Sequence, residues 1–108
     1  MIVKIQDKEI SIKYGFRSLM IYERLTGKTF TPESTSDVII FLYASLAAGE
    51  KTFTMSFDDF VDWLDENPAV LEEFSNFLIS TFQREAEMKE NKTKIEDKKK
   101  LITKKKKM

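Results

Sequence analysis

Hydrophobic and polar residues alternate at the start of the chain. Residues 2–5 and 10–14 form two short stretches rich in isoleucine and valine, and the polar segment Gln6–Glu9 separates them. In the second stretch every other residue is apolar, which is the period of a half-buried strand. This pattern predicts an N-terminal β-hairpin. Because an isolated hairpin is only marginally stable in water, we expect it to pack on other elements.

The spacing of apolar residues changes to three and four from Phe16 onward, which predicts a helix. Phe16, Leu19 and Met20 carry this period, and we interpret Met20 as a core residue. Gly27 is the expected end of the helix, because glycine adopts the left-handed conformation without a Cβ penalty. A loop containing Pro32 follows.

A second helix is expected over residues 36–48, with Thr35 or Ser36 as its cap. Asp37 lies in its first turn, where a negative charge is favourable against the helix dipole. The segment is apolar on every face, which is typical of a buried helix. We therefore expect it to be the central helix of the fold, ending at Gly49.

Two further helices follow. Ser56 precedes a carboxylate by three residues, as in a capping box, and begins the third helix. Asn67-Pro68 ends it and starts the fourth, because proline is favoured at the first helical position. Met55 is interpreted as a core filler. The apolar positions of the third helix are Phe57, Phe60, Val61 and Leu64, and those of the fourth are Val70, Leu71, Phe74, Phe77, Leu78 and Phe82.

These elements predict a mainly α (α+β) fold, with an N-terminal β-hairpin, about four helices and a charged tail. Residues 1–82 form the expected compact domain. Residues 83–108 form a charged extension, helical to about Lys92 and disordered after that point. No apolar run is long enough to cross a bilayer, and no signal peptide is evident, so we expect a cytoplasmic protein.

Composition removes several kinds of chemistry. The 108 residues include no Cys and no His, so thiolate nucleophiles, histidine bases and the usual zinc ligands are all missing. The 18 basic and 18 acidic residues are unevenly distributed: residues 1–82 carry a net charge of −6 and residues 83–108 a net charge of +6. The sequence indicates a non-enzymatic protein with an acidic body and a basic tail.

An acidic arc on the third helix is the first candidate for chemistry. Carboxylates of this kind form a solvated face, a protein-docking surface or a divalent-metal site. They are spread over one side of a helix and do not converge, and no EF-hand spacing or phosphate-cradling glycine loop is present. We therefore predict no metal site, no cofactor and no small-molecule substrate. The arc consists of Asp58, Asp59, Asp62, Asp65 and Glu66.

Three aromatic residues are the candidate partner contacts: Phe53, Phe57 and Trp63. Trp63 flanks the apolar stripe of its helix, a position that suits a partly buried core residue or an interface anchor. The basic tail contains Lys98, Lys99, Lys100, Lys104, Lys105, Lys106 and Lys107. Such a run attracts nucleic acid or anionic lipid in a salt-dependent way. It lacks the arginine and aromatic residues that read bases, so we expect no specific nucleic-acid binding and no membrane binding.

The order of features resembles a known family. After the strand pair come Tyr14-Gly15-Phe16-Arg17-Ser18-Leu19, then the glycine-ended segment 22–28, then an apolar helix, and then the acidic and aromatic segment 55–65. Over roughly residues 1–82 this pattern is similar to the tail assembly chaperones of long-tailed, siphovirus-type bacteriophages and prophages.

The resemblance implies a non-enzymatic chaperone in the cytoplasm of the bacterial host. Such proteins coat the long helical tape measure protein and help recruit tail tube subunits, so the tape measure protein and the tail tube protein are the expected partners. Self-association is a further expectation, given the aromatic residues and the split charge. The alternative is a small regulatory protein that binds nucleic acid through its lysine-rich tail. A metal-dependent enzyme built on the acidic arc is a third, less favoured possibility.

Overall fold

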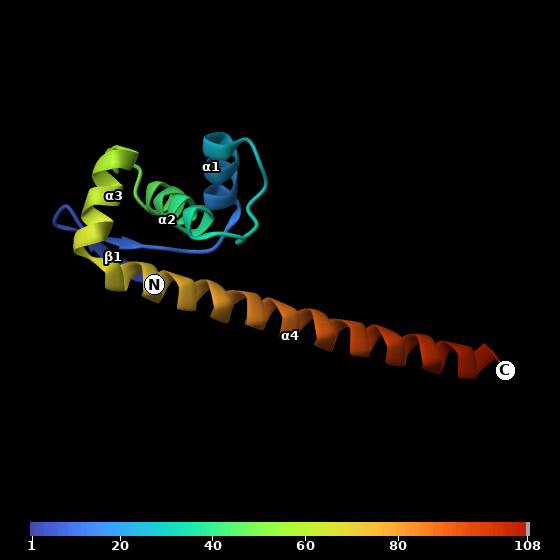
Figure 1. The fold of residues 1–108 in the computed structure, drawn as a ribbon. Coiled ribbons are helices and arrows are strands. Elements are labelled where there is room, and N and C mark those ends of the chain that lie inside the picture. Colours follow the sequence, from blue (N-terminus) through green and yellow to red (C-terminus); the bar gives the residue numbers. More distant parts are fainter. Residues whose placement is uncertain (108) are drawn as a thin grey trace. The chain divides into compact units, whose positions relative to one another are not determined.

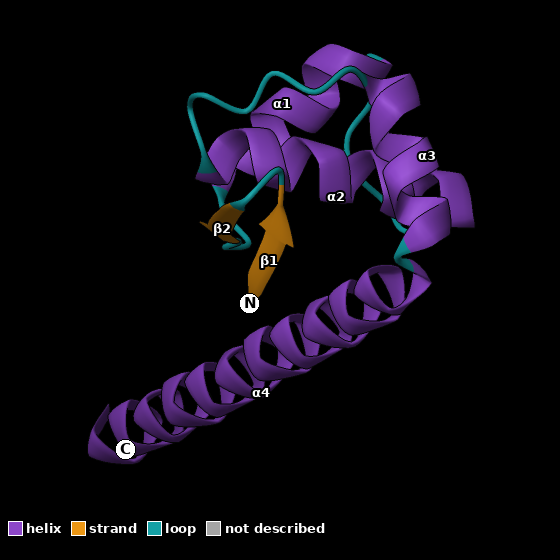
Figure 2. Ribbon diagram, turned by 90° about the vertical axis from the view of Figure 1, so that its left-hand side faces the viewer, coloured by secondary structure: helices purple, strands orange, loops and turns teal. Residues whose placement is uncertain are grey.

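A central helix organises the hairpin and the other helices around it. The computed structural model describes the backbone of residues 1–107 and the side chains of residues 1–87. In Figures 1 and 2, α2 lies between α1 and α3 with the hairpin alongside. The expected hairpin and four helices are thus confirmed. The elements are β1 (Ile2–Ile5), β2 (Lys8–Ser11), α1 (Phe16–Thr26), α2 (Thr35–Gly49), α3 (Phe57–Glu66) and α4 (Pro68–Lys107).

The hairpin turns within two residues. Ile5 pairs with Lys8 in an antiparallel ladder, so only Gln6 and Asp7 form the loop. Both have positive φ angles, 53° and 59°, as a type I′ turn requires. Pairing resumes directly after this two-residue turn, so the polar residues at positions 8 and 9 belong to β2.

The ends of α1 and α2 follow local chemistry. Gly27 ends α1 with a φ of 74°, as predicted, and its N–H donates to the carbonyl oxygen of Glu23 at 2.7 Å. The predicted cap of α2 was wrong by one or two residues. Ser34 is the cap, and its Oγ accepts a hydrogen bond from the Asp37 N–H at 3.2 Å. A serine cap satisfies the N–H three residues ahead, which places the cap at 34.

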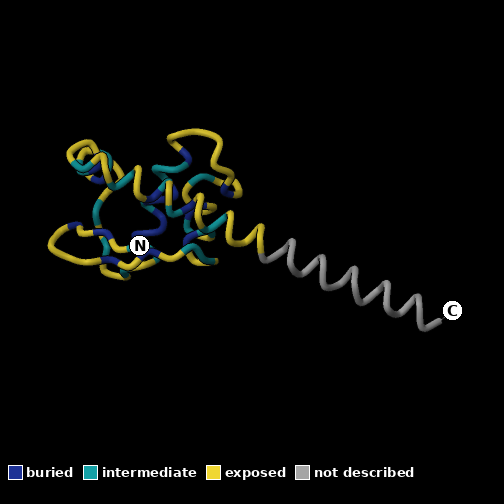
Figure 3. Tube along the Cα trace, turned by 90° about the horizontal axis from the view of Figure 1, so that it is seen from below, coloured by how far each residue is buried: buried dark blue, intermediate teal, exposed yellow. Residues whose placement is uncertain are grey.

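Aromatic rings of α2 and its neighbours form the centre of the core. Phe41 of α2 is fully buried, and the ring of Phe30 stacks on it with the centroids 4.0 Å apart. Tyr22 of α1 meets both rings edge-on, at 5.0 Å from Phe30 and 5.9 Å from Phe41. Phe74 of α4 lies 6.0 Å from Phe41. Six buried residues belong to α2, as expected for the predicted central helix. Figure 3 shows the buried positions in dark blue.

Helix α2 and strand β2 approach so closely that a glycine is required. A Cβ atom on Gly49 would lie 2.7 Å from the carbonyl oxygen of Ser11 and 2.9 Å from Cγ2 of Ile10. Contacts this short are essentially never seen, and the nearer atom belongs to the backbone. Gly49 was predicted as the end of the helix, and it is the last helical residue. It also sets the distance between the helix and the hairpin.

Helix α1 turns a different face inward from the one the sequence predicted. Its buried residues are Ser18 and Tyr22. Phe16 and Met20 are 86% and 54% exposed, so the interpretation of Met20 as a core residue was wrong. The burial of Tyr22 explains the difference. Its large ring enters the core beside Phe41, so Phe16 and Met20, which share the other side of the helix, face outward.

Helix α3 and the start of α4 agree closely with their predicted boundaries. The Ser56 Oγ accepts a hydrogen bond from the Asp59 N–H at 3.1 Å, as the predicted cap requires. Phe60 and Leu64 are the buried residues of α3. Asn67 ends the helix, and its Nδ2 donates to the carbonyl oxygen of Trp63 at 2.9 Å. Helix α4 then begins at Pro68, and its early turns bury Phe74 and Leu78.

The chain divides into two units, residues 1–78 and residues 79–108. The second unit is the continuation of α4, which is helical to Lys107. The sequence predicts the end of this helix near Lys92, whereas the helical backbone continues to Lys107. The side chains beyond residue 87 lie outside the described part of the chain. In the described part of the chain, no helix combines the length and the apolar character needed to cross a membrane.

Candidate protein-docking site

The three predicted contact residues belong to an aromatic cluster centred on Tyr43, which Phe53 and Phe57 contact directly. The ring of Tyr43 on α2 lies 5.7 Å from Phe53, 5.4 Å from Phe57 and 5.3 Å from Phe60. The ring of Trp63 stacks on Phe60 at 6.0 Å. The Tyr43 hydroxyl donates a hydrogen bond to a backbone carbonyl of the loop before α3, which fixes the centre of the cluster. The structure thus brings the three predicted residues into one aromatic cluster.

The members of this cluster differ in their accessibility. Phe57 is 38% exposed, whereas Phe53 and Trp63 are half-buried. Trp63 also borders the hairpin turn, where it lines a shallow depression together with Gln6 and Asp7. Phe57 is therefore the member that offers most surface to a partner. Phe53 and Trp63 offer less.

Phe57 opens onto a small apolar groove between three helices. The groove has a volume of about 150 Å³ and is lined by Leu25 of α1, Ile40 and Tyr43 of α2, and Phe57 of α3. Leu25 is 53% exposed. Apolar side chains at a concave site between helices are typical of a surface that accepts an apolar side chain from a partner.

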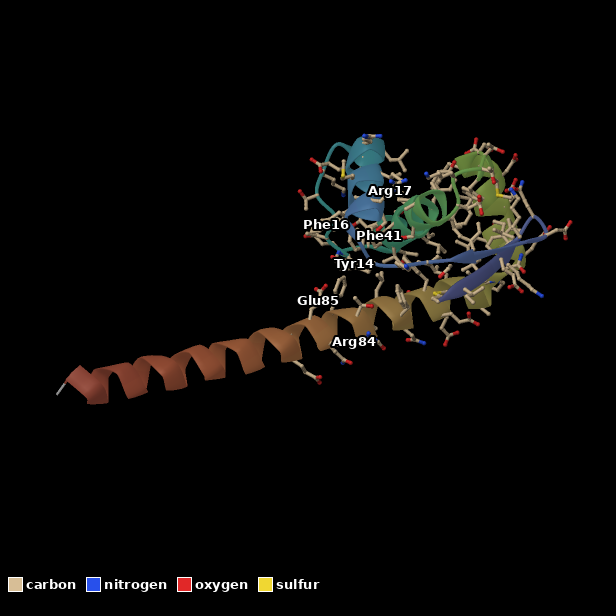
Figure 4. All side chains as sticks on the ribbon, turned by 180° about the vertical axis from the view of Figure 1, so that it is seen from behind. Tyr14, Phe16, Arg17, Phe41, Arg84 and Glu85 are labelled. Carbon is tan, nitrogen blue, oxygen red and sulfur yellow. The ribbon has the colours of Figure 1, made fainter. Side chains whose placement is uncertain are left out.

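The outer face of α1 extends this apolar surface. Phe16, Met20 and Leu25 are each more than half exposed. Arg17 and Arg24 lie on the same outer side of the helix, and with Met20 they line a second depression. Figure 4 labels Phe16 and Arg17 on the first turn. Sequence analysis missed this face because its apolar period was assigned to the core.

The acidic arc of α3 is exposed to solvent along its whole length. All five of its carboxylates are exposed. Within residues 1–87, no three acidic side chains come together in a way that holds a metal ion. We compared the chain with known protein families, and no family model matches it. Searches of curated proteins and of solved structures also found no match.

A buried carboxylate holds the loop between α1 and α2. Asp37 accepts hydrogen bonds from Lys28 Nζ at 3.1 Å and from the Tyr22 hydroxyl at 3.3 Å. The hydrogen bond from Lys28 lowers the pKa of the Asp37 carboxyl below its ordinary value, and the bond from Ser34 acts in the same direction. Burial raises the pKa of Tyr22, as does the adjacent Asp37 charge. These contacts join residues 28–37 to the core, so we assign them a structural role.

The predicted basic tail lies outside the residues whose side chains are described. It consists of Lys98, Lys99, Lys100, Lys104, Lys105, Lys106 and Lys107. Their predicted attraction for anionic partners rests on the sequence alone.

Proposed function

We propose that this protein is a tail assembly chaperone that binds the tape measure protein of a long-tailed phage or prophage, keeps it soluble and helps to recruit tail tube subunits. The observation that supports this function best is the exposed apolar surface made by the outer face of α1 and the groove at Phe57. An acidic body of this size has little reason to expose such a surface unless a partner covers it. The family resemblance supplies the identity of that partner.

The chemistry of the surface suits a helical client. Apolar side chains spaced three and four residues apart along one helix would cover Met20 and enter the groove beside Leu25 and Phe57. Acidic residues flanking that stripe would lie near the two arginines of α1. The exposed acidic arc of α3 would keep the coated complex soluble and limit contacts between like-charged copies. Each copy would then bind with modest affinity, so that tube subunits displace it as the tail grows.

Co-expression tests the proposal directly. The tape measure protein encoded in the same genome is produced with wild-type chaperone or with the double variant Met20→Ser/Leu25→Ser, and the soluble fraction of the tape measure protein is measured. We expect wild type to keep it soluble and the variant to lose most of that effect. The matched control is Ile2→Ser, because Ile2 is an apolar residue of the hairpin that is 63% exposed.

Three outcomes would contradict the proposal. If the tape measure protein were equally soluble with the double variant and with wild type, the assigned surface would not be the binding surface. A tape measure protein that is soluble without any chaperone, or insoluble with all forms, would remove the function itself. The far-UV circular dichroism spectrum of the variant is compared with that of wild type, so that loss of folding is recognised.

Removing the charge of the lysine tail distinguishes the nucleic-acid alternative from the chaperone function. If the lysine tail binds nucleic acid, replacing its seven lysines by glutamine abolishes binding to a DNA duplex, and wild-type binding falls steeply with salt. A chaperone with the same replacement retains most of its client binding. The two functions therefore give opposite results with one variant.

A further inference from the structure

A cavity at the N-terminal end of α1 is separate from the apolar groove. It has a volume of about 500 Å³, and Lys13, Arg17 and Ser45 are among its lining residues. This volume falls in the range of roughly 300–1,000 Å³ that is usual for small-molecule sites. The helices supply small residues, Gly15 from the start of α1 and Gly49 from the end of α2. A Cβ atom on Gly15 would meet nothing within 4 Å, so this position borders open space.

Several hydrogen-bond donors converge on this cavity. Gly15 is the N-terminal cap of α1 and has an extended backbone, and no side chain within residues 1–87 caps the helix from this position. The N–H groups of the first turn, including those of Phe16 and Arg17, have no partner inside the helix. Such a turn carries partial positive charge and binds anions. The Ser18 Oγ instead bonds back to Gly15.

A buried hydroxyl among the lining residues is the second, independent observation. Ser45 of α2 is 1% exposed, and its Oγ has no hydrogen-bond partner among the described residues. Most buried hydroxyls in folded proteins have a partner. Ser45 lines the same cavity as Lys13 and Arg17. A ligand oxygen in the cavity would satisfy this hydroxyl.

The charge of the lining selects the ligand. Lys13 and Arg17 supply two positive charges, and no carboxylate contributes to the lining within residues 1–87. A phosphate monoester carries a charge of about −1.5 to −2 at pH 7 and has three acceptor oxygens. A carboxylate has one charge and two oxygens, so it would leave part of the donor set unused. Phe16, which is 86% exposed, borders the cavity and offers a ring to the organic part of the ligand.

We propose that this cavity binds a small phosphate monoester, with the phosphate on the first turn of α1, Lys13, Arg17 and Ser45, and the organic part against Phe16. The sequence contains no glycine-rich phosphate loop, and for that reason it predicted no such site. The cavity uses two glycines from distant positions, Gly15 and Gly49, instead of one contiguous loop. This inference does not depend on the proposed chaperone function.

The test is a titration of the full chain followed by ¹⁵N NMR, with uridine monophosphate, inorganic phosphate, uridine and acetate as probes at constant ionic strength. We expect saturable shifts of the Phe16 and Arg17 amides with uridine monophosphate, weaker saturable shifts with inorganic phosphate, and none with uridine. The variant Lys13→Gln/Arg17→Gln should weaken binding about tenfold or more, because two charge-assisted contacts are lost. Lys51→Gln, an exposed lysine outside the cavity, serves as the control and should bind like wild type.

Ser45→Ala separates a ligand contact from a structural role. Removing an unpartnered buried hydroxyl should leave stability unchanged or raise it, while binding of uridine monophosphate weakens several-fold. Equal effects of Lys51→Gln and Lys13→Gln/Arg17→Gln, or shifts that never saturate, would overturn the site. Acetate binding as tightly as phosphate would overturn the phosphate assignment. Inorganic phosphate binding as tightly as uridine monophosphate would overturn the monoester and leave free phosphate as the ligand.

Discussion

Replacing Gly49 by alanine should destabilise the protein, although alanine is the better helix former. In an open helix the change gains at most about 1 kcal/mol. Here the new Cβ would lie 2.7 Å from the carbonyl oxygen of Ser11, whereas ordinary contacts begin at 3.4 Å. The helix and the strand must therefore separate by about 0.7 Å, the difference between these two distances. Overpacking of this kind costs roughly 1–3 kcal/mol, so we expect a net loss of about 1–2 kcal/mol.

Urea denaturation measures this loss, with Trp63 fluorescence and far-UV circular dichroism as two independent probes. In a thermal unfolding experiment, the midpoint temperature should fall by about 4–8 °C for each kcal/mol of unfolding free energy that is lost. Gly15→Ala is the matched control, because a Cβ there would meet nothing within 4 Å. It should cost less than about 1 kcal/mol, which is the difference between glycine and alanine at an N-cap without any steric term. A Gly49→Ala protein that is as stable as wild type, or more stable, would refute the close approach of α2 and β2.

Three other changes test features of the same unit. Gln6→Asn combined with Asp7→Gly should stabilise the protein by about 1 kcal/mol in urea denaturation, because both positions have positive φ; no gain would contradict the type I′ turn. Asp37→Asn should lower stability at pH 7. The hydrogen bond from Lys28 keeps the folded-state pKa of Asp37 below its ordinary value of 3.8. The stabilisation that the charged Asp37 carboxylate provides is therefore present above that pH and is lost as the pH falls through the folded-state pKa. The two proteins should therefore converge in urea titrations below about pH 3.8, and a constant difference down to pH 2 would argue against this carboxylate. Ser56→Ala should cost about 1 kcal/mol by the same assay through loss of the α3 cap, with Ser56→Thr retaining most of it.

The sequence predicted the features that depend on neighbours in the chain. Caps, glycine stops and the Asn67-Pro68 break are governed by local hydrogen bonding, so the order and type of all six elements could be predicted. The apolar run of α2 also indicated its central place, because a helix that is apolar on every face has to be covered. Local rules were less precise at the hairpin turn, where two residues without a glycine signal adopt positive φ.

The inward face of α1 could not be predicted in this way. Its apolar residues surround much of the helix, so periodicity alone does not say which side is buried. The decision rests on Tyr22, whose ring fits between Phe30 and Phe41 and whose hydroxyl reaches Asp37. All three partners lie elsewhere in the sequence. The docking surface on α1 and the cavity beside Ser45 both follow from this orientation, so the sequence alone revealed neither.

The central position of α2 has a consequence for the order in which the protein folds. Its partner α1 is joined to it by a short loop, whereas the contact between Phe41 and Phe74 connects residues far apart in the chain. Closing the shorter loop costs less entropy, so the pairing of α1 with α2 should already be present in the folding transition state, before α4 docks. In stopped-flow kinetics, Ala44→Gly in α2 should mainly slow folding, and Leu78→Ala in α4 should mainly accelerate unfolding. The last element to be added would then also be the first to detach, which makes the early turns of α4 the point where unfolding of this unit begins.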